Sequence, residues 1–318
     1  MQTFRHESAM LDEAIDCLAC RRGGIYVDGT LGGGGHARAI CRQIVPEGIF
    51  IGIDQDMDAI AHARENLTPP DVQIHLFHGN FDKLPDYLAQ LKISAVHGIL
   101  LDLGLSQHQL EASGRGFSFQ KDEPLDMRMD IRGSTRAEDL LHSLSVDQLS
   151  RLFHDYGEER WAGRIARAIA AHREKQPLRT SRQLAELVRS AVPAGSAARQ
   201  KVHPATRVFM ALRIAVNGEL DRLKAFLGFA LALLLPGGRL VILSFHSLED
   251  RLVKQAFKAW ARGCSCPPEL PLCVCSGKPR AKLITKKVMR PSDREVRRNP
   301  MARSTRLRAV EKIAGMER

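Results

Sequence analysis

The sequence lacks any apolar run long enough to cross a membrane. Its longest such run, FLGFALALLLPGG at 226–238, is shorter than the roughly 20 residues of a spanning helix and ends at Pro-Gly-Gly. The N-terminus, MQTFRHESAMLDEA, also lacks the charged-then-apolar layout of a secretion signal and contains acidic residues early. From these absences we expect a cytoplasmic protein that has no membrane partner.

Cysteine is scarce and odd in number, with seven residues in 318, and no secretion signal accompanies it, which argues against a disulfide framework. Four of the cysteines form a C-x-C-x6-C-x-C cluster: Cys264, Cys266, Cys273 and Cys275. Four thiols can bind a structural zinc ion, but this spacing is tighter than the usual C-x2-C pairing. We therefore expect no metal and keep zinc as the less favoured alternative.

Acidic charge is nearly absent from the C-terminal part of the chain. Residues 276–318 hold fourteen Lys and Arg but four Asp and Glu, so they carry +10 of the net charge of +11. A localised cationic strip is typical of a polyanion partner, although a solubilising tail would have the same composition. Apolar runs, KLITKKVM and RLRAVEKI, interleave these charges. We therefore expect this region to be folded and to bind nucleic acid.

Repeats and low-complexity tracts are absent too, and the organisation follows from hydrophobic periodicity. Short apolar strands are expected at 24–30, 48–56, 72–81, 96–106 and 238–245, and helical patterns separate the first four. Near-continuous apolar strands separated by helices predict an α/β protein with a parallel sheet covered on both faces. Only helical periodicity occurs from 135 to 200, and a long helix is expected to begin near residue 203. We expect a core formed by residues 1–110 and 207–318, interrupted by an all-helical domain at 111–206.

Glycine is concentrated in one stretch, YVDGTLGGGGH at 26–36, between the first expected strand and the next helix. Ligands of open parallel sheets bind beyond the carboxyl ends of the strands. Glycines there allow positive φ and let backbone N–H groups approach a ligand. Asp54 ends the second strand and is placed to accept hydrogen bonds from two ribose hydroxyls. The loop and Asp54 together predict an adenosine-containing ligand.

This spacing alone fits both NAD and S-adenosylmethionine. Asp28 lies inside the turn, where a carboxylate would repel a pyrophosphate but can meet an ammonium group, and Asp102 ends another strand. The chain also has one such sheet and no second domain for hydride chemistry. These features favour S-adenosylmethionine. An NAD-dependent oxidoreductase is one alternative, and a nucleic-acid-binding or ribosome-assembly protein with a degenerate cofactor site is another.

Longer blocks of the sequence carry a family resemblance that runs from about residue 5 to 313. The blocks include VDGTLGGGGHA, GILLDLGLSQHQLE, YGEERWAGRIARAI, HPATRVFMALRIAVNGEL and PGGRLVILSFHSLEDRLVK. They resemble the RsmH (MraW) family of bacterial S-adenosylmethionine-dependent 16S rRNA (cytosine-N4)-methyltransferases. The resemblance implies a class I, Rossmann-like methyltransferase core and direct in-line methyl transfer to a splayed-out cytidine in the decoding region. It implies 16S rRNA, either naked or within the small ribosomal subunit, as the substrate, and we infer no obligate protein partner.

The resemblance also implies a set of cofactor contacts: Gly33, Gly34, Gly35, His36, Asp54, Phe81, Asp102 and Gln109. Phe81 follows the third expected strand, and from the sequence it is equally well an adenine wall or an ordinary core aromatic. His36 either directs an imidazole N–H toward the cofactor carboxylate or simply begins the helix.

Methylation of an exocyclic amine needs hydrogen-bond acceptors, because the nitrogen lone pair of cytosine is delocalised into the ring. The Asn/Asp-Pro-Pro-aromatic motif of many amino-methyltransferases is replaced here by DLGLS after the fourth strand. The catalytic candidates are Asp102, Ser106, Ser244 and His246. His246 can orient the base or take up its proton. Alternatively, it is a neighbour of a helix N-cap formed by Ser247.

Two sets of residues are candidates for RNA contacts. The loop GRGFSFQKDEPLDMRMD contains Arg115, Phe117 and Phe119, and aromatic stacking contributes roughly 1–3 kcal/mol per base. A packed domain linker is an equally good interpretation of this loop. Arg160, Arg164 and Arg167 stand at helical spacing and Arg207 follows in HPATR. These arginines either bind phosphates or form a solvated face with Glu158 and Glu159.

Overall fold

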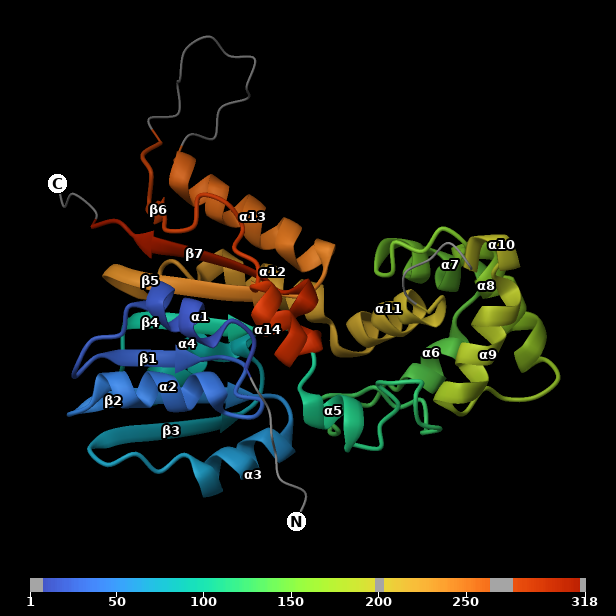
Figure 1. Ribbon diagram of the computed structural model, residues 1–318, viewed down its shortest axis with the longest axis horizontal. Coiled ribbons are helices and arrows are strands. Elements are labelled where there is room, and N and C mark those ends of the chain that lie inside the picture. Colours follow the sequence, from blue (N-terminus) through green and yellow to red (C-terminus); the bar gives the residue numbers. More distant parts are fainter. Residues whose placement is uncertain (1–7, 198–202, 264–276, 315–318) are drawn as a thin grey trace, which may run out of the picture. The chain divides into compact units, whose positions relative to one another are not determined.

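The computed structural model describes residues 8–197, 203–263 and 277–314, and its contacts divide the chain into two compact units. The core unit contains residues 1–104 and 220–318, and the helical unit contains residues 105–219 (Figure 1). Among the described residues, no helix combines the length and apolar character that a membrane span requires.

The core unit is built around a seven-stranded sheet in the order β3-β2-β1-β4-β5-β7-β6. The strands are β1 (Ile25–Asp28), β2 (Gly48–Asp54), β3 (Val72–His78), β4 (Val96–Asp102), β5 (Leu234–Ser244), β6 (Ala281–Leu283) and β7 (Arg306–Lys312). The first five are parallel, whereas β7 is antiparallel to β5 and to β6. The strand order reverses between β1 and β4, which is where open α/β sheets bind ligands.

Helices cover both faces of this sheet, because side chains alternate between two apolar clusters. The helices of this unit are α1 (Leu11–Leu18), α2 (Gly35–Ile44), α3 (Met57–Asn66), η1 (Phe81–Lys83), α4 (Leu84–Gln90), α12 (Glu219–Phe229), α13 (Ser247–Arg262), α14 (Asp293–Arg298) and η2 (Pro300–Ser304). Tyr26 and Phe50 pack with α1, α2 and α3, whereas Val27 and Ile51 pack with α4, α12 and α13. Figure 1 shows α1 and α2 in front of the sheet and α4 behind it. The predicted Rossmann-like core is confirmed.

The described part of the basic C-terminal region, residues 277–314, is folded, as its apolar runs predicted. Strands β6 and β7 extend the sheet beyond β5, and Leu307, Ala309 and Val310 are fully buried there. The segment between these strands forms α14 and η2. The sheet therefore includes residues from both ends of the chain.

The helical unit has its own apolar core. Its helices are α5 (Gln107–Glu111), α6 (Ala137–Ser143), α7 (Val146–Asp155), α8 (Ala162–Arg173), α9 (Ser181–Ala191), α10 (Ala194–Ala197) and α11 (Ala205–Asn217). Leu149, Phe153, Ile165 and Val188 are fully buried within it. The predicted insertion therefore has a separate core.

Two expectations need correction at the end of the insertion. The division falls after Gly104 and Glu219 rather than at 110 and 207, because α11 buries Val208 and Leu212 in the core of the helical unit. The single long helix expected from residue 203 is two helices. Gly218 separates α11 from α12 in a left-handed conformation with φ of 59°, which glycine adopts without a Cβ penalty.

Candidate functional site

The glycine loop connects β1 to α2 at the carboxyl edge of the parallel strands. Gly32 and Gly34 adopt left-handed conformations with φ of 47° and 72°. Gly29 and Gly35 are required for close packing within the chain. A Cβ would lie 2.4 Å from a methyl carbon of Leu101 at Gly29, and 2.1 Å from the hydroxyl oxygen of Ser8 at Gly35. The loop is therefore held against β4 on one side and the N-terminal segment on the other.

Asp28 and Asp102 end the neighbouring strands β1 and β4, and the Thr30 hydroxyl connects them. Thr30 Oγ1 accepts a hydrogen bond from the Asp102 backbone N–H at 2.6 Å and lies 3.5 Å from Asp28 Oδ1, to which it donates. Asp28 Oδ1 also accepts the Thr30 backbone N–H at 3.0 Å. Asp28 is fully buried, and the Asp102 side chain is 14% exposed. One oxygen of each carboxyl, Asp28 Oδ2 and Asp102 Oδ1, is buried without a hydrogen-bond partner among the described residues.

Asp54 ends β2 and closes the glycine loop from the other side. Its Oδ2 accepts the Gly32 N–H and its Oδ1 accepts the Asp56 N–H, both at 2.8 Å. These contacts fix the carboxyl group beside Gly32, the first of the four consecutive glycines. Contact with a ribose stays a prediction, since the carboxyl already has these two backbone donors.

Burial raises the pKa of all three carboxyl groups. Burial, with a smaller contribution from the Asp54 charge, raises the pKa of Asp28 to about 7. Burial likewise raises the pKa of Asp54 to about 6, although three backbone hydrogen bonds oppose it. The pKa of Asp102 lies well above its ordinary value, first because of burial and then because of the nearby Asp28 and Glu249 carboxyls. Three acids that repel one another in a buried place favour a cationic ligand.

His36 and Phe81 complete the immediate surroundings of the loop. His36 lies in the first turn of α2, and its Nδ1 is 3.5 Å from Asp102 Oδ2. Phe81 begins η1 and is 7% exposed, with its ring edge against Phe226 at 5.5 Å between centroids. Phe81 thus contributes to the core. Its predicted contact with an adenine remains untested, as does the predicted contact of His36.

The second group of catalytic candidates lies where β5 meets α13. His246 is itself the N-cap of α13, so the expectation that Ser247 caps this helix is wrong. Its Nδ1 faces the Glu249 backbone N–H at 3.5 Å, and its Nε2 is 3.1 Å from the Glu249 carboxylate. Glu249 also accepts the Phe245 N–H at 2.9 Å. Both ring nitrogens of His246 therefore face Glu249, and the catalytic role of His246 stays a prediction.

Ser244 is almost fully buried at the end of β5. Its hydroxyl donates to the Arg306 backbone carbonyl at 3.3 Å, across the β5–β7 pair. This contact gives Ser244 a role in holding the edge of the sheet. Its catalytic role stays a prediction.

Ser106 and Gln109 belong to the helical unit and form the capping box of α5. The Ser106 hydroxyl accepts the Gln109 N–H at 3.2 Å, and Gln109 Oε1 accepts the Ser106 N–H at 3.0 Å. Gln109 is 5% exposed. The two residues therefore define where α5 begins, and their predicted contacts with cofactor and substrate are untested.

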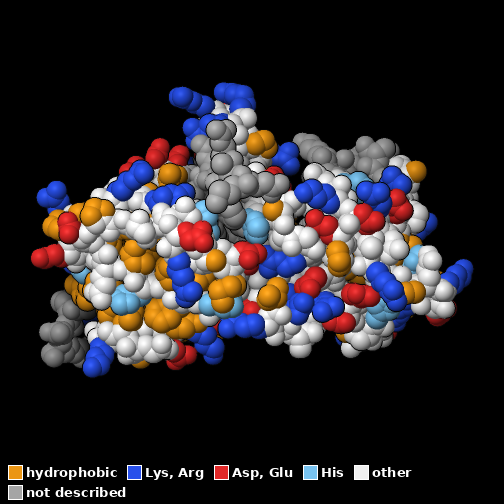
Figure 2. All heavy atoms as spheres, turned by 90° about the horizontal axis from the view of Figure 1, so that it is seen from below, with side chains coloured by type: hydrophobic (Ala, Val, Ile, Leu, Met, Phe, Trp, Pro, Cys, Tyr) orange, Lys and Arg blue, Asp and Glu red, His pale blue; other side chains and the backbone are white. Residues whose placement is uncertain are grey.

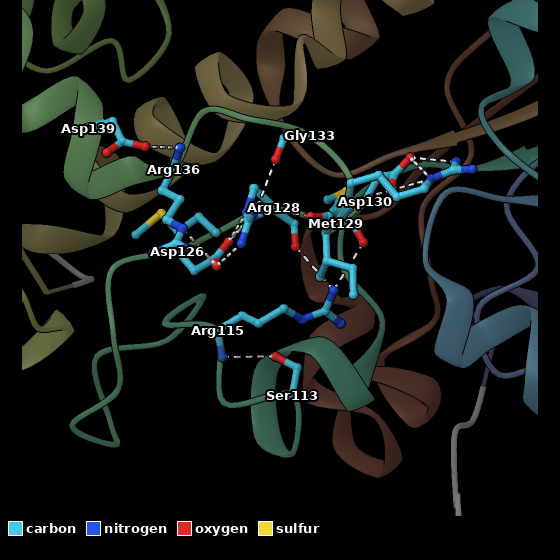
Figure 3. Close-up of polar contacts among 12 residues, drawn as sticks. Ser113, Arg115, Asp126, Arg128, Met129, Asp130, Gly133, Arg136 and Asp139 are labelled. Atoms are coloured by element: carbon cyan, nitrogen blue, oxygen red, sulfur yellow. Dashed lines mark hydrogen bonds and ion pairs between the residues drawn. The ribbon is translucent and has the colours of Figure 1, made fainter.

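The predicted base-binding loop is braced from within the helical unit (Figure 3). The Arg115 guanidinium donates to the carbonyls of Arg128 and Met129 at 3.1 and 3.0 Å and lies 5.5 Å from the centre of the Phe117 ring. Arg128 pairs with Asp126 at 2.6 Å and donates to the carbonyls of residues 131 and 133. Arg115 and Phe117 are both buried. They support the loop here, and their predicted RNA contact is untested.

Phe119 lies nearer the surface of the same unit. Its ring is partly exposed and packs against His203 and Phe209, with centroids 4.7 and 5.1 Å away. Among the three loop residues proposed to stack on a base, Phe119 is the most accessible.

Among the arginines predicted to bind phosphates, Arg160, Arg164 and Arg167 are exposed on the helical unit, and Arg207 is partly exposed. Arg164 and Arg167 lie on α8, and the Arg160 guanidinium is 5.3 Å from the centre of the Trp161 ring. Arg207 on α11 donates to the Glu158 carbonyl at 3.2 Å and is 4.0 Å from the buried Glu159 carboxylate. Their exposure permits phosphate contacts, which remain predictions. The four clustered cysteines at 264–275 lie outside the described residues.

Three residues of the site escaped the sequence analysis: Ser8, Thr30 and Glu249. Thr30 stands two residues after Asp28, which is the spacing at which an aspartate side chain typically accepts a backbone N–H. Glu249 stands three residues after His246, which is the spacing of a capping box. No sequence signal indicates that Ser8 packs on Gly35.

The residues present fit a cationic adenosyl ligand. Unpartnered buried carboxyl oxygens at Asp28 and Asp102 suit a positively charged group and disfavour a pyrophosphate. The glycine loop before the first turn of α2 is the expected place for a ligand's polar end. Asp54 lies at the same edge, at the end of β2, which is the strand next to β1.

Comparison with known proteins matches residues 3–313 to the model of the MraW methylase family. A relative named ribosomal RNA small subunit methyltransferase H, from Desulfosudis oleivorans, is 52% identical over 98% of this chain and 100% of its own length. A relative of the same name from Syntrophotalea carbinolica is 50% identical over 98% and 99%. A solved putative rRNA-methylase from Clostridium thermocellum has 11% identity and a TM-score of 0.43, with 96% and 98% covered.

Proposed function

Because the chain belongs to the MraW methylase family, we propose that it methylates the N4 amine of a cytidine in the decoding region of 16S rRNA. It is a methyltransferase, and its cofactor is S-adenosylmethionine, as the sequence resemblance implied. The observation that carries the proposal is the unpartnered Asp102 carboxyl oxygen beside the glycine loop, in a chain half identical to named rRNA methyltransferases. We place this reaction in the cytoplasm.

The cofactor is held by the edge of the sheet that the acids occupy. S-adenosylmethionine supplies, when bound, an electrophilic methyl group on a positively charged sulfur. Gly33, Gly34 and Gly35 provide a backbone free of side chains, and Asp54 offers carboxyl oxygens for the ribose. The carboxyl groups of Asp28 and Asp102 make the electrostatic potential of the site more negative, so they favour a cationic ligand over a neutral one.

Asp102 serves the target amine. Its unpartnered Oδ1 can accept a hydrogen bond from the amine, which directs the nitrogen lone pair away from the ring and toward the methyl group. The raised pKa makes Asp102 a stronger base than an ordinary aspartate, so Oδ1 can also receive the proton that the amine releases. His246 serves to position the N-terminus of α13 through Glu249. Correct orientation of the two reactants can lower the barrier by roughly 7–11 kcal/mol.

The helical unit recognises the RNA. The exposed Arg160 and Arg164 and the partly exposed Arg207 are suited to phosphates, and Phe119 is suited to stack on an unpaired base. A base inside a helix must be splayed out before its amine can react. The braced loop around Arg128 would hold such a stacking residue at a defined place.

The two other functions considered from the sequence are less well supported. Membership of a methylase family argues against an NAD-dependent oxidoreductase. A binding protein with a degenerate cofactor site should have lost the acids of that site. Here Asp28, Asp54 and Asp102 are all present at the ends of adjacent strands.

The test is transfer of labelled methyl groups to small ribosomal subunits from a bacterial strain lacking the gene. We expect a single modified nucleotide, identified by mass spectrometry as N4-methylated cytidine. The Asp102→Asn variant should lower kcat by about 10²- to 10⁴-fold, which is the usual contribution of a general base. Asp16→Asn, which changes an exposed acid on α1, serves as the matched control and should leave kcat unchanged.

Two results would overturn the proposal. One is label on a protein or on a nucleotide other than cytidine. The other is an Asp102→Asn variant with wild-type kcat although it still binds S-adenosylmethionine by calorimetry.

A further inference from the structure

The arginines of α14, η2 and β7 differ sharply in how they are partnered. Arg306 and Arg308 on β7 both pair with Asp250 on α13, at 3.8 and 2.7 Å. By contrast, Arg294, Arg297 and Arg303 on α14 and η2 are exposed, and their side chains have no hydrogen bond or ion pair among the described residues. We refer to these three exposed arginines, together with Arg298, as the α14–η2 surface.

This surface lies at the same edge of the sheet as the cofactor site. Strand β7 begins at Arg306, which pairs with Ser244 at the carboxyl end of β5. The preceding α14 and η2 are therefore at the edge where β1, β2 and β4 end in Asp28, Asp54 and Asp102. Figure 1 shows α14 at the end of the sheet toward which β1 points.

Two contacts fix α14 relative to the glycine loop. Glu295 on α14 accepts the Met10 backbone N–H at 2.6 Å, and Met10 is buried. Two residues earlier in the chain, Ser8 packs against Gly35. The arginines of α14 are thus carried on a helix that is tied to the cofactor loop within one unit.

Burial of apolar side chains does not explain the position of α14. No residue of α14 is buried, and only Ala302 and Thr305 anchor the following segment. The cations of Arg294, Arg297 and Arg303 have no ion pair among the described residues, and keeping them together costs electrostatic free energy unless an anion neutralises them. Figure 2 shows Lys and Arg side chains standing together along the upper margin of the face it presents.

We infer that the α14–η2 surface binds the phosphate backbone of the RNA substrate beside the reacting cytidine. This inference rests on the proposed function, because it assigns a docking surface to the same reaction. Arginine suits phosphate through bidentate hydrogen bonds. A lipid surface fits less well, since α14 has six residues and Met301 is the one large apolar side chain of this surface that is exposed.

The experiment compares two triple charge reversals on the same unit. The test variant is Arg294→Glu/Arg297→Glu/Arg303→Glu. The control is Arg22→Glu/Arg42→Glu/Arg64→Glu, which changes three exposed arginines at the opposite, amino edge of the sheet, before β1 and in the last turns of α2 and α3. Fluorescence anisotropy measures the Kd for a decoding-region RNA fragment at several salt concentrations, and calorimetry measures S-adenosylhomocysteine binding.

Each phosphate contact contributes about 0.7–0.9 to the slope of log K against log salt. Loss of three contacts should therefore flatten the slope by about 2 to 3, which corresponds to on the order of 100-fold weaker RNA binding at 0.1 M salt. The control should retain the wild-type slope, and both variants should bind S-adenosylhomocysteine normally. A triple Arg→Gln variant should flatten the slope in the same direction if the charge reversal prevents folding.

The inference is wrong if the test variant and the control have the same slope. It is also wrong if the test variant binds vesicles of anionic lipid less well but binds RNA normally. Because RNA binding is measured without turnover, these results stand apart from the methyl-transfer assay. Failure of the wild-type protein to methylate small subunits would refute the proposed function alone.

Discussion

Replacing Asp28 by asparagine should change the stability of the cofactor-free protein in a pH-dependent way. Asp28 is fully buried, and one of its carboxyl oxygens has no hydrogen-bond partner among the described residues. Its pKa is raised from 3.8 to about 7. The folded state therefore binds this proton more tightly than the unfolded state, and stability falls as the pH rises from about 4 to about 7.

The magnitude follows from the shift. One pKa unit corresponds to about 1.4 kcal/mol, so relative to acid pH the raised pKa of Asp28 lowers the free energy of unfolding by about 4 kcal/mol at pH 8 and by about 1.7 kcal/mol at pH 5. At pH 5 the carboxyl is ionised in the unfolded state alone, and at pH 8 it is ionised in both states. Asparagine has no charge to bury, but it leaves a buried amide donor unpaired at a cost of about 1–3 kcal/mol. The difference in free energy of unfolding between Asp28→Asn and wild type should therefore shift in favour of the variant by about 2.5 kcal/mol from pH 5 to pH 8.

Urea denaturation of cofactor-free wild type and Asp28→Asn at pH 5 and pH 8 measures this difference. The matched control is Asp16→Asn, which replaces an exposed carboxyl and should show the same small effect on stability at both pH values. An Asp28→Asn effect that is equal at the two pH values would refute the electrostatic reasoning. The variant should also bind S-adenosylmethionine more weakly than wild type at pH 8, because it lacks a negative charge beside a cationic ligand.

Two further substitutions test the loops. Gly35→Ala places a methyl group where Ser8 lies and should lower both the melting temperature and the affinity for S-adenosylmethionine. Adding Ser8→Gly should restore part of both. A wild-type melting curve for Gly35→Ala would contradict the close packing. Arg128→Ala removes hydrogen bonds to Asp126 and to two backbone carbonyls and should destabilise the helical unit by about 2–4 kcal/mol. In the Arg128→Ala variant, hydrogen exchange should be faster in residues 113–136, while β1 to β5 keep wild-type protection. Wild-type protection of residues 113–136 in the variant would contradict this prediction.

Much of the core and the acids of the site could be predicted from the sequence. Apolar strands that end in Asp28, Asp54 and Asp102 predict both a parallel sheet and acids gathered at one edge, because parallel strands end on the same side. The apolar residues of β7 likewise distinguished a folded tail from a disordered one. These predictions hold because each depends on a short, local pattern.

Contacts between distant segments could not be predicted in this way. The charge pattern of the 113–130 loop is the same whether Arg115 faces solvent or, as observed, donates to backbone carbonyls. The extent of the insertion was misjudged because the apolar pattern of α11 does not reveal which core it enters. The cap of α13 was misassigned because histidine is an uncommon N-cap beside serine, and the reach of Glu249 depends on three-dimensional geometry.

The order of strands in the sheet has a consequence for biosynthesis. Strand β4 pairs with β1 and β5, and β5 pairs with β7, so the sheet requires residues up to Lys312. The all-helical segment between β4 and β5 has a core of its own and leaves the ribosome before β5 does. During translation the helical unit can thus fold before the core unit. The core unit, although its N-terminal strands are made first, can complete its sheet only after β7 has been synthesised.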